Sequence, residues 1–141
     1  MITAENTQNM PEIEMQWAVK AMTHAETYWG ILQQRPGSSL KLTKIDDEIY
    51  TTFRNVFPDL NIEYLKETED FKNEKAKAKW RGYIKQFENR VNDFSFGTLI
   101  RINSHEGYSE ENSMFLTRIQ FLCIEIARSK EGFNDEFFSK N

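Results

Sequence analysis

A chain of 141 residues, of which 39% are hydrophobic and 13% aromatic, is long enough for one compact domain with a buried core. Its formal net charge of -4 argues against a protein that coats nucleic acid, because such proteins usually need a basic face to displace counterions from phosphate. A single cysteine excludes an internal disulfide, and with two histidines the chain lacks the ligands of a usual zinc site. We therefore expect one domain in a reducing compartment, the cytosol or the nucleus, with no metal and no cofactor.

The start of the chain is polar and shows no apolar periodicity. Residues 1–10 are predicted to form a flexible N-terminus, followed by a helical domain over 11–134 and a C-terminal tail over 135–141. The N-terminal stretch lacks the basic start and apolar run of a secretory signal, and no apolar run approaches the length of a membrane span, about 18 residues. The sequence thus predicts a protein that does not enter a membrane.

The first predicted helix begins at Pro11 and runs through PEIEMQWAVKAMTHAETYWGILQQ. Proline suits the first turn of a helix, the glutamates that follow suit the positive end of the helix dipole, and apolar residues recur at helical spacing. The polar positions form only a narrow edge, so this helix should be mostly buried. His24 lies inside the apolar arc, where a hydrogen-bonded core or boundary histidine is more common than a metal ligand or a base.

A second helix follows the turn RPGSS and covers LTKIDDEIYTTFRNVFP. Thr43 is predicted as its N-cap, with Asp46 three residues on, and Pro58 as its end. Its buried stripe is formed by Ile45, Ile49, Phe53 and Phe57. The two adjacent aspartates would suit acid/base chemistry or magnesium only if they pointed the same way, and neighbours on a helix diverge by about 100°. We therefore interpret them as residues of the helix cap.

A basic helix is predicted over FKNEKAKAKWRGYIKQFENRVNDF, with Trp80 heading its apolar stripe. Its lysines make it the one place where an RNA or ribosome contact can be argued, with Trp80 as a ring on which bases stack. A solvated face is the favoured interpretation, because the lysines spread around the helix. The next stretch, SFGTLIRIN, is either a short strand or a helical turn.

The last predicted helix covers NSMFLTRIQFLCIEIARSKEG, residues 112–132. Apolar residues recur at helical steps, basic residues lie near its end where the dipole favours them, and Gly132 can close it. The same apolar residues would also fit a buried strand if their spacing is ignored. Cys123 lies among large apolar side chains, so we interpret it as a buried structural cysteine rather than a reactive thiol.

The stretch NSHEGYSEEN gathers a histidine, three glutamates and two serines, as an active site would. Ser109 is predicted as the N-cap of the last helix, with Glu110 and Glu111 in its first turn. His105 and Glu106 remain, and the sequence supplies no second partner for either. No G-x-S-x-G elbow, H-E-x-x-H helix or P-loop occurs in the chain. We therefore predict that the protein is not an enzyme.

Six blocks of the chain resemble a small eukaryotic family, the polysaccharide biosynthesis domain-containing proteins, in its short fungal-like form. They are EIEMQWAVKAMTHAETYW, LKLTKIDDEIY, KAKWRGYIKQFE, DFSFGTLIRI, GYSEEN and RIQFLCIEIARSKEGFN, and the match runs from about Pro11 to Asn134. The resemblance implies a mainly helical orthogonal bundle. This agrees with the fold class predicted from the residues, a single mainly α domain of about four to six helices with room for one short strand pair.

The same resemblance implies a cytosolic chaperone dedicated to newly made translation elongation factor one-alpha. Such a chaperone would hold the GTP-binding domain of its client as that domain emerges from the ribosome, alongside the nascent-polypeptide-associated complex. It would release the client when the client binds GTP. We expect it to act as a monomer and to bind no DNA.

Two other interpretations remain. The protein could be an RNA- or ribosome-associated binding protein, or a relative of plant wall proteins that share the family label and methylate glucuronoxylan with S-adenosylmethionine. A Rossmann-like methyltransferase needs strands alternating with helices and a glycine-rich turn at the cofactor, whereas the six glycines here are dispersed. The methyltransferase is therefore the least favoured of the three.

Charged residues near the ends of the matched blocks are the predicted partner contacts. A protein that holds a client needs exposed contact surface and charges that steer it, not a catalytic dyad. The predicted partner contacts are Lys44, Asp47, Glu110, Glu111 and Arg118. On the RNA or ribosome interpretation the contacts are Lys75 and Lys79. Each of these charges, taken alone, would also serve as a helix cap or a solvated surface group.

Overall fold

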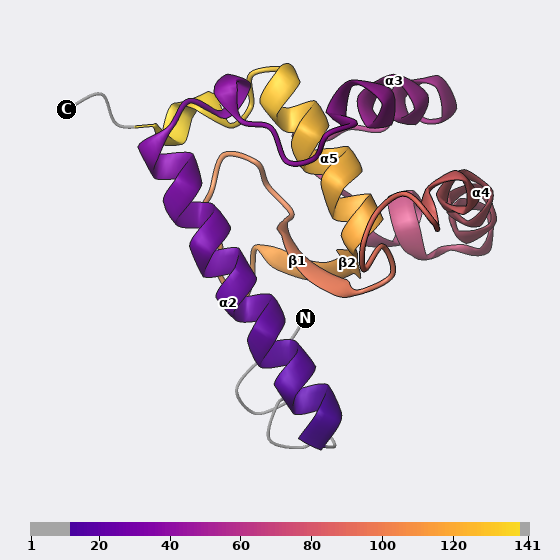
Figure 1. Ribbon diagram of the computed structural model, residues 1–141, viewed down its shortest axis with the longest axis horizontal. Coiled ribbons are helices and arrows are strands. Elements are labelled where there is room, and N and C mark those ends of the chain that lie inside the picture. Colours follow the sequence, from indigo (N-terminus) through magenta and orange to yellow (C-terminus); the bar gives the residue numbers. More distant parts are fainter. Residues whose placement is uncertain (1–11, 139–141) are drawn as a thin grey trace.

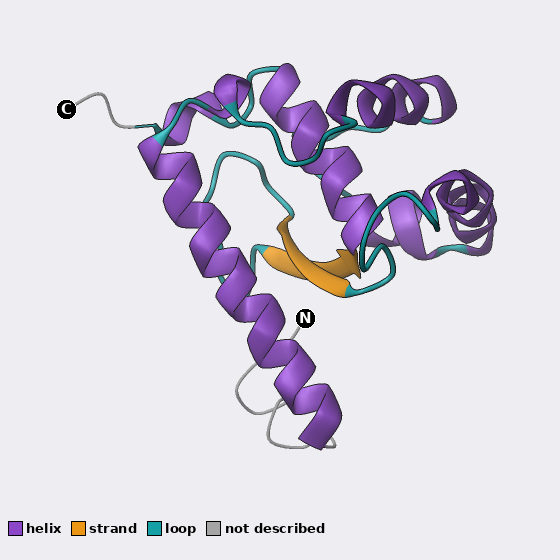
Figure 2. Ribbon diagram, viewed as in Figure 1, coloured by secondary structure: helices purple, strands orange, loops and turns teal. Residues whose placement is uncertain are grey.

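The computed structural model describes residues 12–138, apart from the side chains at 12–15 and 17, as a mainly helical domain with one strand pair (Figures 1 and 2). The predicted fold class is thereby confirmed. The predicted flexible stretch 1–10 lies outside the described residues. The long elements are α2 (Glu12–Gln34), α3 (Asp46–Val56), α4 (Glu74–Ile84), β1 (Gly97–Arg101), β2 (Ser113–Thr117) and α5 (Arg118–Lys130). Short helical turns cover Gly37–Ser39, Glu67–Lys72, Lys85–Phe87 and Asp135–Phe137.

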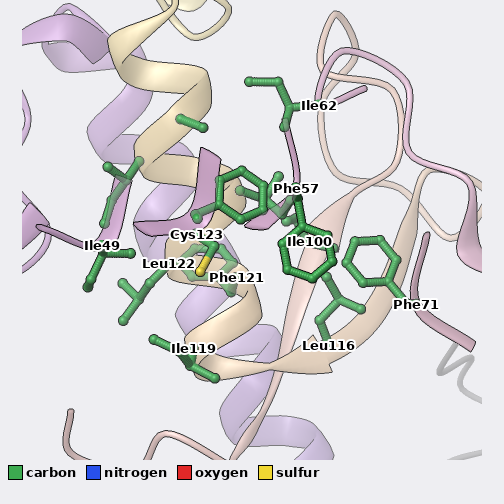
Figure 3. Close-up of a cluster of buried hydrophobic side chains, with 14 of the residues drawn as sticks. Ile49, Phe57, Ile62, Phe71, Ile100, Leu116, Ile119, Phe121, Leu122 and Cys123 are labelled. Atoms are coloured by element: carbon green, nitrogen blue, oxygen red, sulfur yellow. The ribbon is translucent and has the colours of Figure 1, made fainter. Parts of the chain in front are cut away.

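The last helix, α5, is the centre of the domain. Figure 1 shows α2 along one side of α5, α3 and α4 on the other, and the strand pair at the N-terminal end of α5. All residues from Ile119 to Ser129 are buried, because this helix is covered on every side. Figure 3 shows side chains from α3, β1 and α5, among them Ile49, Ile100 and Leu122, meeting around Cys123. Within residues 12–138, no helix is long and apolar enough to cross a membrane.

Cys123 is a buried free cysteine, as predicted. Burial raises the pKa of its thiol to about 12, which leaves almost no reactive thiolate at neutral pH. Its Sγ lies 3.6 Å from the hydroxyl oxygen of Tyr83 on α4. The thiol therefore serves packing between α4 and α5.

The region read from the sequence as one helix over 112–132 is a strand followed by a helix. β1 and β2 pair antiparallel, with Gly97 opposite Thr117 and Arg101 opposite Ser113, so SFGTLIRIN contributes a strand. Three of the five β2 residues are buried, which makes their apolar run look like part of a buried helix. The chain changes from strand to helix at Thr117, whose side chain accepts from the Gln120 backbone while the Gln120 side chain accepts from the Thr117 backbone.

The predicted N-cap at Ser109 is therefore wrong. Ser109 lies in the turn that leads into β2, where its Oγ accepts a hydrogen bond from the Asn112 backbone N–H at 3.0 Å. Glu110 and Glu111 are exposed in that turn and do not belong to the first turn of a helix. A serine followed by two glutamates suits both settings, because serine bonds nearby backbone N–H groups in turns as well as at caps.

The second helix begins at Asp46, and its N-cap is Ile45, two residues later than the predicted Thr43. Asp46 reaches back, and its carboxylate accepts backbone N–H bonds from Leu42 at 2.8 Å and Thr43 at 2.7 Å. Thr43 Oγ1 in turn accepts from the backbone N–H of Ile45 at 3.0 Å. The predicted pairing of Thr43 with Asp46 thus exists, but it closes a turn in front of α3 rather than capping the helix directly.

The predicted basic helix is shorter than its apolar spacing indicated. Asn73 caps α4 by accepting from the Ala76 backbone N–H at 2.7 Å, and α4 ends at Ile84, after which the chain continues through tighter turns. Phe87 and Val91, which continue the apolar stripe, remain buried although they lie beyond α4. Burial of the stripe therefore did not require a continuous helix.

One buried carboxylate, Glu125 of α5, joins four parts of the fold. It accepts a hydrogen bond from the Tyr28 hydroxyl at 2.7 Å and pairs with Arg101 at 3.3 Å and Arg128 at 2.8 Å. Asn134 donates to the same carboxylate at 3.1 Å. Burial alone would raise the pKa of Glu125, but the charges of Arg101 and Arg128 lower it to about 2. The network ties α2, β1 and the C-terminal turn to α5.

Candidate partner-binding site

A groove of about 730 Å³ lies where the segment 38–48 runs beside the C-terminal half of α5. It is mainly apolar inside and charged at its edges. The apolar lining consists of Leu40, Leu42, Ile45 and Ile126, and the exposed charged residues around it are Lys41, Lys44, Asp47, Glu48 and Lys130. An apolar interior with a charged rim is the composition of a surface that binds another polypeptide.

The segment is held in place by the C-terminal turn. Gly37 packs against Asn134, and a Cβ added at Gly37 would lie only 2.6 Å from the Asn134 Cβ, so glycine is required for this approach. The backbone N–H of Ser38 donates to the Asp135 side chain at 3.0 Å. The groove therefore depends on residues at the start of the stretch that the sequence placed in a C-terminal tail.

The carboxylates of the groove already have partners. Asp47 pairs with Lys130 at 2.5 Å, and this hydrogen bond holds the pKa of the Asp47 carboxyl below its usual value. Glu48 pairs with Arg90 through both of its oxygens, at 2.5 and 2.7 Å. Asp46 caps the turn described above. None of these three carboxylates is left as an unpaired acid or base.

Two smaller hollows continue the same face toward the N-terminus of α5. Lys44, Arg90 and Arg118 line one of about 240 Å³. Arg118 also lines the other, of about 90 Å³, together with Lys20 of α2 and Phe96. The structure thus brings three predicted partner contacts, Lys44, Asp47 and Arg118, onto one continuous face.

The other two predicted partner contacts lie elsewhere. Glu110 and Glu111 are exposed in the turn at the start of β2, whereas Arg118 directly follows its end. A five-residue strand spans about 17 Å, so these glutamates are separated from the groove by the length of β2. The structure gives them no shared surface with Lys44.

Lys75 and Lys79, the predicted RNA or ribosome face, line a separate hollow of about 380 Å³ beside α4. The ammonium nitrogen of Lys79 lies 4.8 Å from the centre of the Phe57 ring. The same hollow is lined by three carboxylate residues, Asp59, Glu69 and Asp70. This mixture of charges does not favour a phosphate backbone.

Trp80 is not the stacking ring that the RNA interpretation needs. It is 2% exposed, its Nε1 donates to the Asp70 carbonyl at 2.8 Å, and its ring stacks on Phe57 with 4.2 Å between centroids. Bases stack on exposed aromatic faces. The sequence could not separate the two roles, because a tryptophan at the head of an apolar stripe suits both.

Comparison with known proteins identifies the family. The family model described as PBDC1 protein matches residues 13–139. This chain belongs to the PBDC1 family. The predicted resemblance to the polysaccharide biosynthesis domain-containing proteins is confirmed at that level.

Relatives in animals and fungi share about half of their aligned residues with this PBDC1 family member. Protein PBDC1 of Homo sapiens is 48% identical over 133 residues, 94% of this chain and 57% of the human protein. Protein PBDC1 of Mus musculus is 48% identical over 130 residues, 92% of this chain and 65% of the mouse protein. The chain thus spans less than two thirds of either mammalian relative. The PBDC1 homolog of Schizosaccharomyces pombe is 46% identical over 138 residues, 95% of this chain and 93% of that protein.

A solved structure shares the fold. The solution NMR structure of a Saccharomyces cerevisiae protein superimposes with a TM-score of 0.83 at 41% identity, covering 96% of this chain and 95% of that one. The helices and the strand pair described above are therefore also the architecture of an experimentally determined protein.

His105 has two carboxylate partners in this PBDC1 family member that the sequence did not reveal. Its ring nitrogens lie 2.5 Å from a Glu63 oxygen and 2.7 Å from a Glu136 oxygen. The hydrogen bond to Glu63 raises the pKa of His105 most, and the hydrogen bond to Glu136 raises it further. The three residues join the loop before β2, the segment before Glu67–Lys72 and the C-terminal turn. Their separation in sequence, 42 and 31 residues, explains why no local pattern indicated the contact.

His24 lies at the edge of the core, as predicted, but not in the predicted bonding state. It is half-buried between Tyr28 and Phe121, and within the described residues its Nδ1 has no hydrogen-bond partner. Burial lowers the pKa of His24, and the nearby positive charge of Arg118 lowers it further. Across the described side chains, no cluster of three or more His, Cys, Asp or Glu is arranged to hold a metal ion.

The His105 contacts predict a specific pH dependence of stability. Because the folded-state pKa is raised above 6.5, these contacts contribute stability that is fully present below pH 6.5 and is lost as the pH rises through the folded-state pKa. We expect His105→Gln to flatten this part of the profile, measured as the urea midpoint from about pH 6 to 9. His24 titrates with the opposite sign in both proteins, so the difference between them isolates His105. Parallel profiles would contradict the prediction.

Proposed function

We propose that this protein is a cytosolic chaperone that binds the nascent GTP-binding domain of translation elongation factor one-alpha, beside the ribosome and the nascent-polypeptide-associated complex, and releases it when that domain binds GTP. The proposal combines the family resemblance with one observation, the groove between segment 38–48 and α5. Its apolar interior and charged rim suit an exposed segment of an unfinished domain.

An exposed aromatic side chain at this face supports a binding role. Phe96 lines the hollow of about 90 Å³ and is 44% exposed. Aromatic side chains are enriched in protein interfaces, where they supply much of the buried contact area. A chaperone gains from such surface because its client presents apolar groups that are not yet packed.

We propose a non-enzymatic role because of how the acids of the groove are used. Asp46 accepts backbone N–H bonds, Asp47 pairs with Lys130, and Glu48 pairs with Arg90. A general acid or base must be free to exchange a proton with a substrate. These carboxylates instead hold the walls of the groove.

Release by GTP follows from thermodynamic linkage. If the protein binds the nucleotide-free client more tightly than the GTP-bound client, GTP must weaken the complex by the same factor by which the complex weakens GTP binding. Coupling of about 1–3 kcal/mol, which is usual for linked sites, corresponds to roughly 5- to 150-fold. The switch then resides in the client, and the chaperone needs no nucleotide site.

The test is a calorimetric titration of the purified chain with the isolated GTP-binding domain of elongation factor one-alpha. We expect binding to the nucleotide-free domain and at least roughly fivefold weaker binding in GTP, with GDP as the matched nucleotide control. Absence of binding to both forms would refute the proposed function.

A second titration, with RNA in place of the client, tests the RNA or ribosome interpretation. A double variant, Lys75→Glu with Lys79→Glu, should bind the client like the wild type. If the RNA or ribosome interpretation is right, the wild type binds RNA with an affinity that falls steeply with salt, and the double variant loses that binding.

A further inference from the structure

Four cations line the two small hollows, and we call Lys20, Lys44, Arg90 and Arg118 the cationic ridge. They come from α2, from the turn before α3, from the turn after α4 and from the first position of α5. Arg118 is common to both hollows and so stands at the middle of the ridge. Among the described residues that line the two hollows, Asp93 is the one carboxylate.

Most positive charge on the ridge is not neutralised within the fold. The neighbouring acids Asp47 and Glu48 are held by Lys130 and Arg90. Within the described side chains, Lys20, Lys44 and Arg118 form no salt bridge, although the whole protein carries a net charge of -4. A local excess of positive charge on an acidic protein steers an oppositely charged partner to one place.

The geometry favours carboxylates of a polypeptide over a small free anion. A small anion at a helix start would be held by free backbone N–H groups. Here the N–H of Arg118 donates to Phe96, that of Ile119 to Phe94, and that of Gln120 to Thr117. These three N–H groups are therefore not available to a ligand, and the charges that can contact one are those of the side-chain cations. Because they come from separate elements, several acidic groups spaced along one chain can contact them together.

The same edge offers apolar contact. Phe96 is 44% exposed, and the ammonium nitrogen of Lys20 lies 5.5 Å from its ring centre. An exposed aromatic ring between cations is a common centre of binding energy at protein interfaces. A segment with acidic and apolar residues would use both parts of the surface.

We infer that the cationic ridge is the docking surface for an acidic segment of the client protein, one that carries apolar residues beside its carboxylates. This inference rests on the proposed function, since it names the part of the client that this face recognises. It assigns Lys44 and Arg118 the direct contacts with client carboxylates and Phe96 the apolar contact.

The first experiment compares two double variants that change the net charge equally. Lys44→Glu with Arg118→Glu reverses the ridge, and Lys75→Glu with Lys79→Glu reverses charge beside α4. We expect the ridge variant to bind the GTP-binding domain about tenfold or more weakly and with a shallower salt dependence, and the α4 variant to bind it like the wild type. Circular dichroism checks that each variant is folded, and Arg118→Gln is the milder replacement.

Equal binding by the ridge variant and the wild type, or equal weakening by both variants, would overturn the inference while the proposed function stands. A second experiment keeps the inference testable if the client does not bind at all. A synthetic glutamate-rich peptide with interspersed leucines is titrated into the ¹⁵N-labelled chain, with a lysine-rich peptide of the same length as control. We expect amide shifts at Lys44, Phe96 and Arg118 with the acidic peptide alone. No shifts there, or shifts centred on Lys75 and Lys79, would overturn it.

Discussion

Replacement of Glu125 by alanine should lower the free energy of unfolding by about 3–5 kcal/mol, because it leaves two buried guanidinium groups without their counter-charge. Arg101 and Arg128 both have side chains that are 0% exposed, so water cannot replace the lost carboxylate. Tyr28 and Asn134 would lose a hydrogen-bond partner in the same step. The contacts between α2, β1, the C-terminal turn and α5 should weaken together.

The measurement is urea unfolding followed by circular dichroism, which gives the midpoint and the slope. Glu125→Gln separates charge from packing, since the amide keeps the shape but not the negative charge, and it should also destabilise strongly. Glu131→Ala is the matched control. Glu131 pairs with Arg54 at 3.0 Å with both side chains partly exposed, so its loss should cost about 1 kcal/mol or less. Similar midpoints for Glu125→Ala and Glu131→Ala would contradict the argument.

Trp80→Ala should be the other severe change, at about 3–5 kcal/mol, because it empties the space of the largest buried side chain in the core. Its ring stacks on Phe57, Phe53 and Phe71, with centroid distances of 4.2, 6.0 and 5.6 Å. Loss of these contacts affects α3, α4 and the turn before α4 together. If Trp80 were instead an exposed ring on which RNA bases stack, its replacement by alanine would change the free energy of unfolding little.

Trp80→Phe provides the comparison for the alanine variant. Phenylalanine retains an aromatic ring but loses the Nε1 donor to the Asp70 carbonyl, so we expect it to recover much of the stability. Urea unfolding should be followed by far-ultraviolet circular dichroism, because tryptophan fluorescence changes with the substitution itself. If both variants unfold at the wild-type midpoint, Trp80 does not anchor this core.

The apolar spacing of the sequence was enough to locate α2 and α3. Each helix buries one stripe, which in α2 is described from Ala18 to Leu32, and the period of the stripe is a local property of the chain. The prediction that the first helix is mostly buried is wrong, because Val19, Met22 and Ile31 are exposed on its other side. Pro58 follows α3, as the sequence indicated, and Gly132 follows α5 with a positive φ of 91°, which suits glycine at a helix end. These signals act within a few residues and need no tertiary contact.

The region from Ser113 to Thr117 was misread because burial on both sides hides the alternation of a strand. Its pairing with β1 is formed by residues that lie 12 or more positions away, which a local pattern does not show. Once β2 is paired, the cap must move to the first residue after it, Thr117. The error at Ser109 followed from the error in the strand.

For the candidate site too, some features follow from the local sequence and others only from tertiary contacts. Charged residues at the ends of the matched blocks were identified from the sequence alone, but only the fold decided which of them share a face. Lys44 and Arg118 meet because the turn before α3 lies beside the first turn of α5. Glu110 lies at the opposite end of β2 from Arg118. His105 contacts Glu63 and Glu136 only because the loops that carry these residues pack together.

By itself, the sequence determined the helical class, the apolar stripes and the unreactive cysteine, because these depend on residue spacing and composition. The tertiary structure decided the strand pair, the buried pairing of Glu125 with two arginines, and the joining of groove and cationic ridge into one face. Each of these depends on contacts between segments far apart in the chain, whose formation is set by the packing of the whole core.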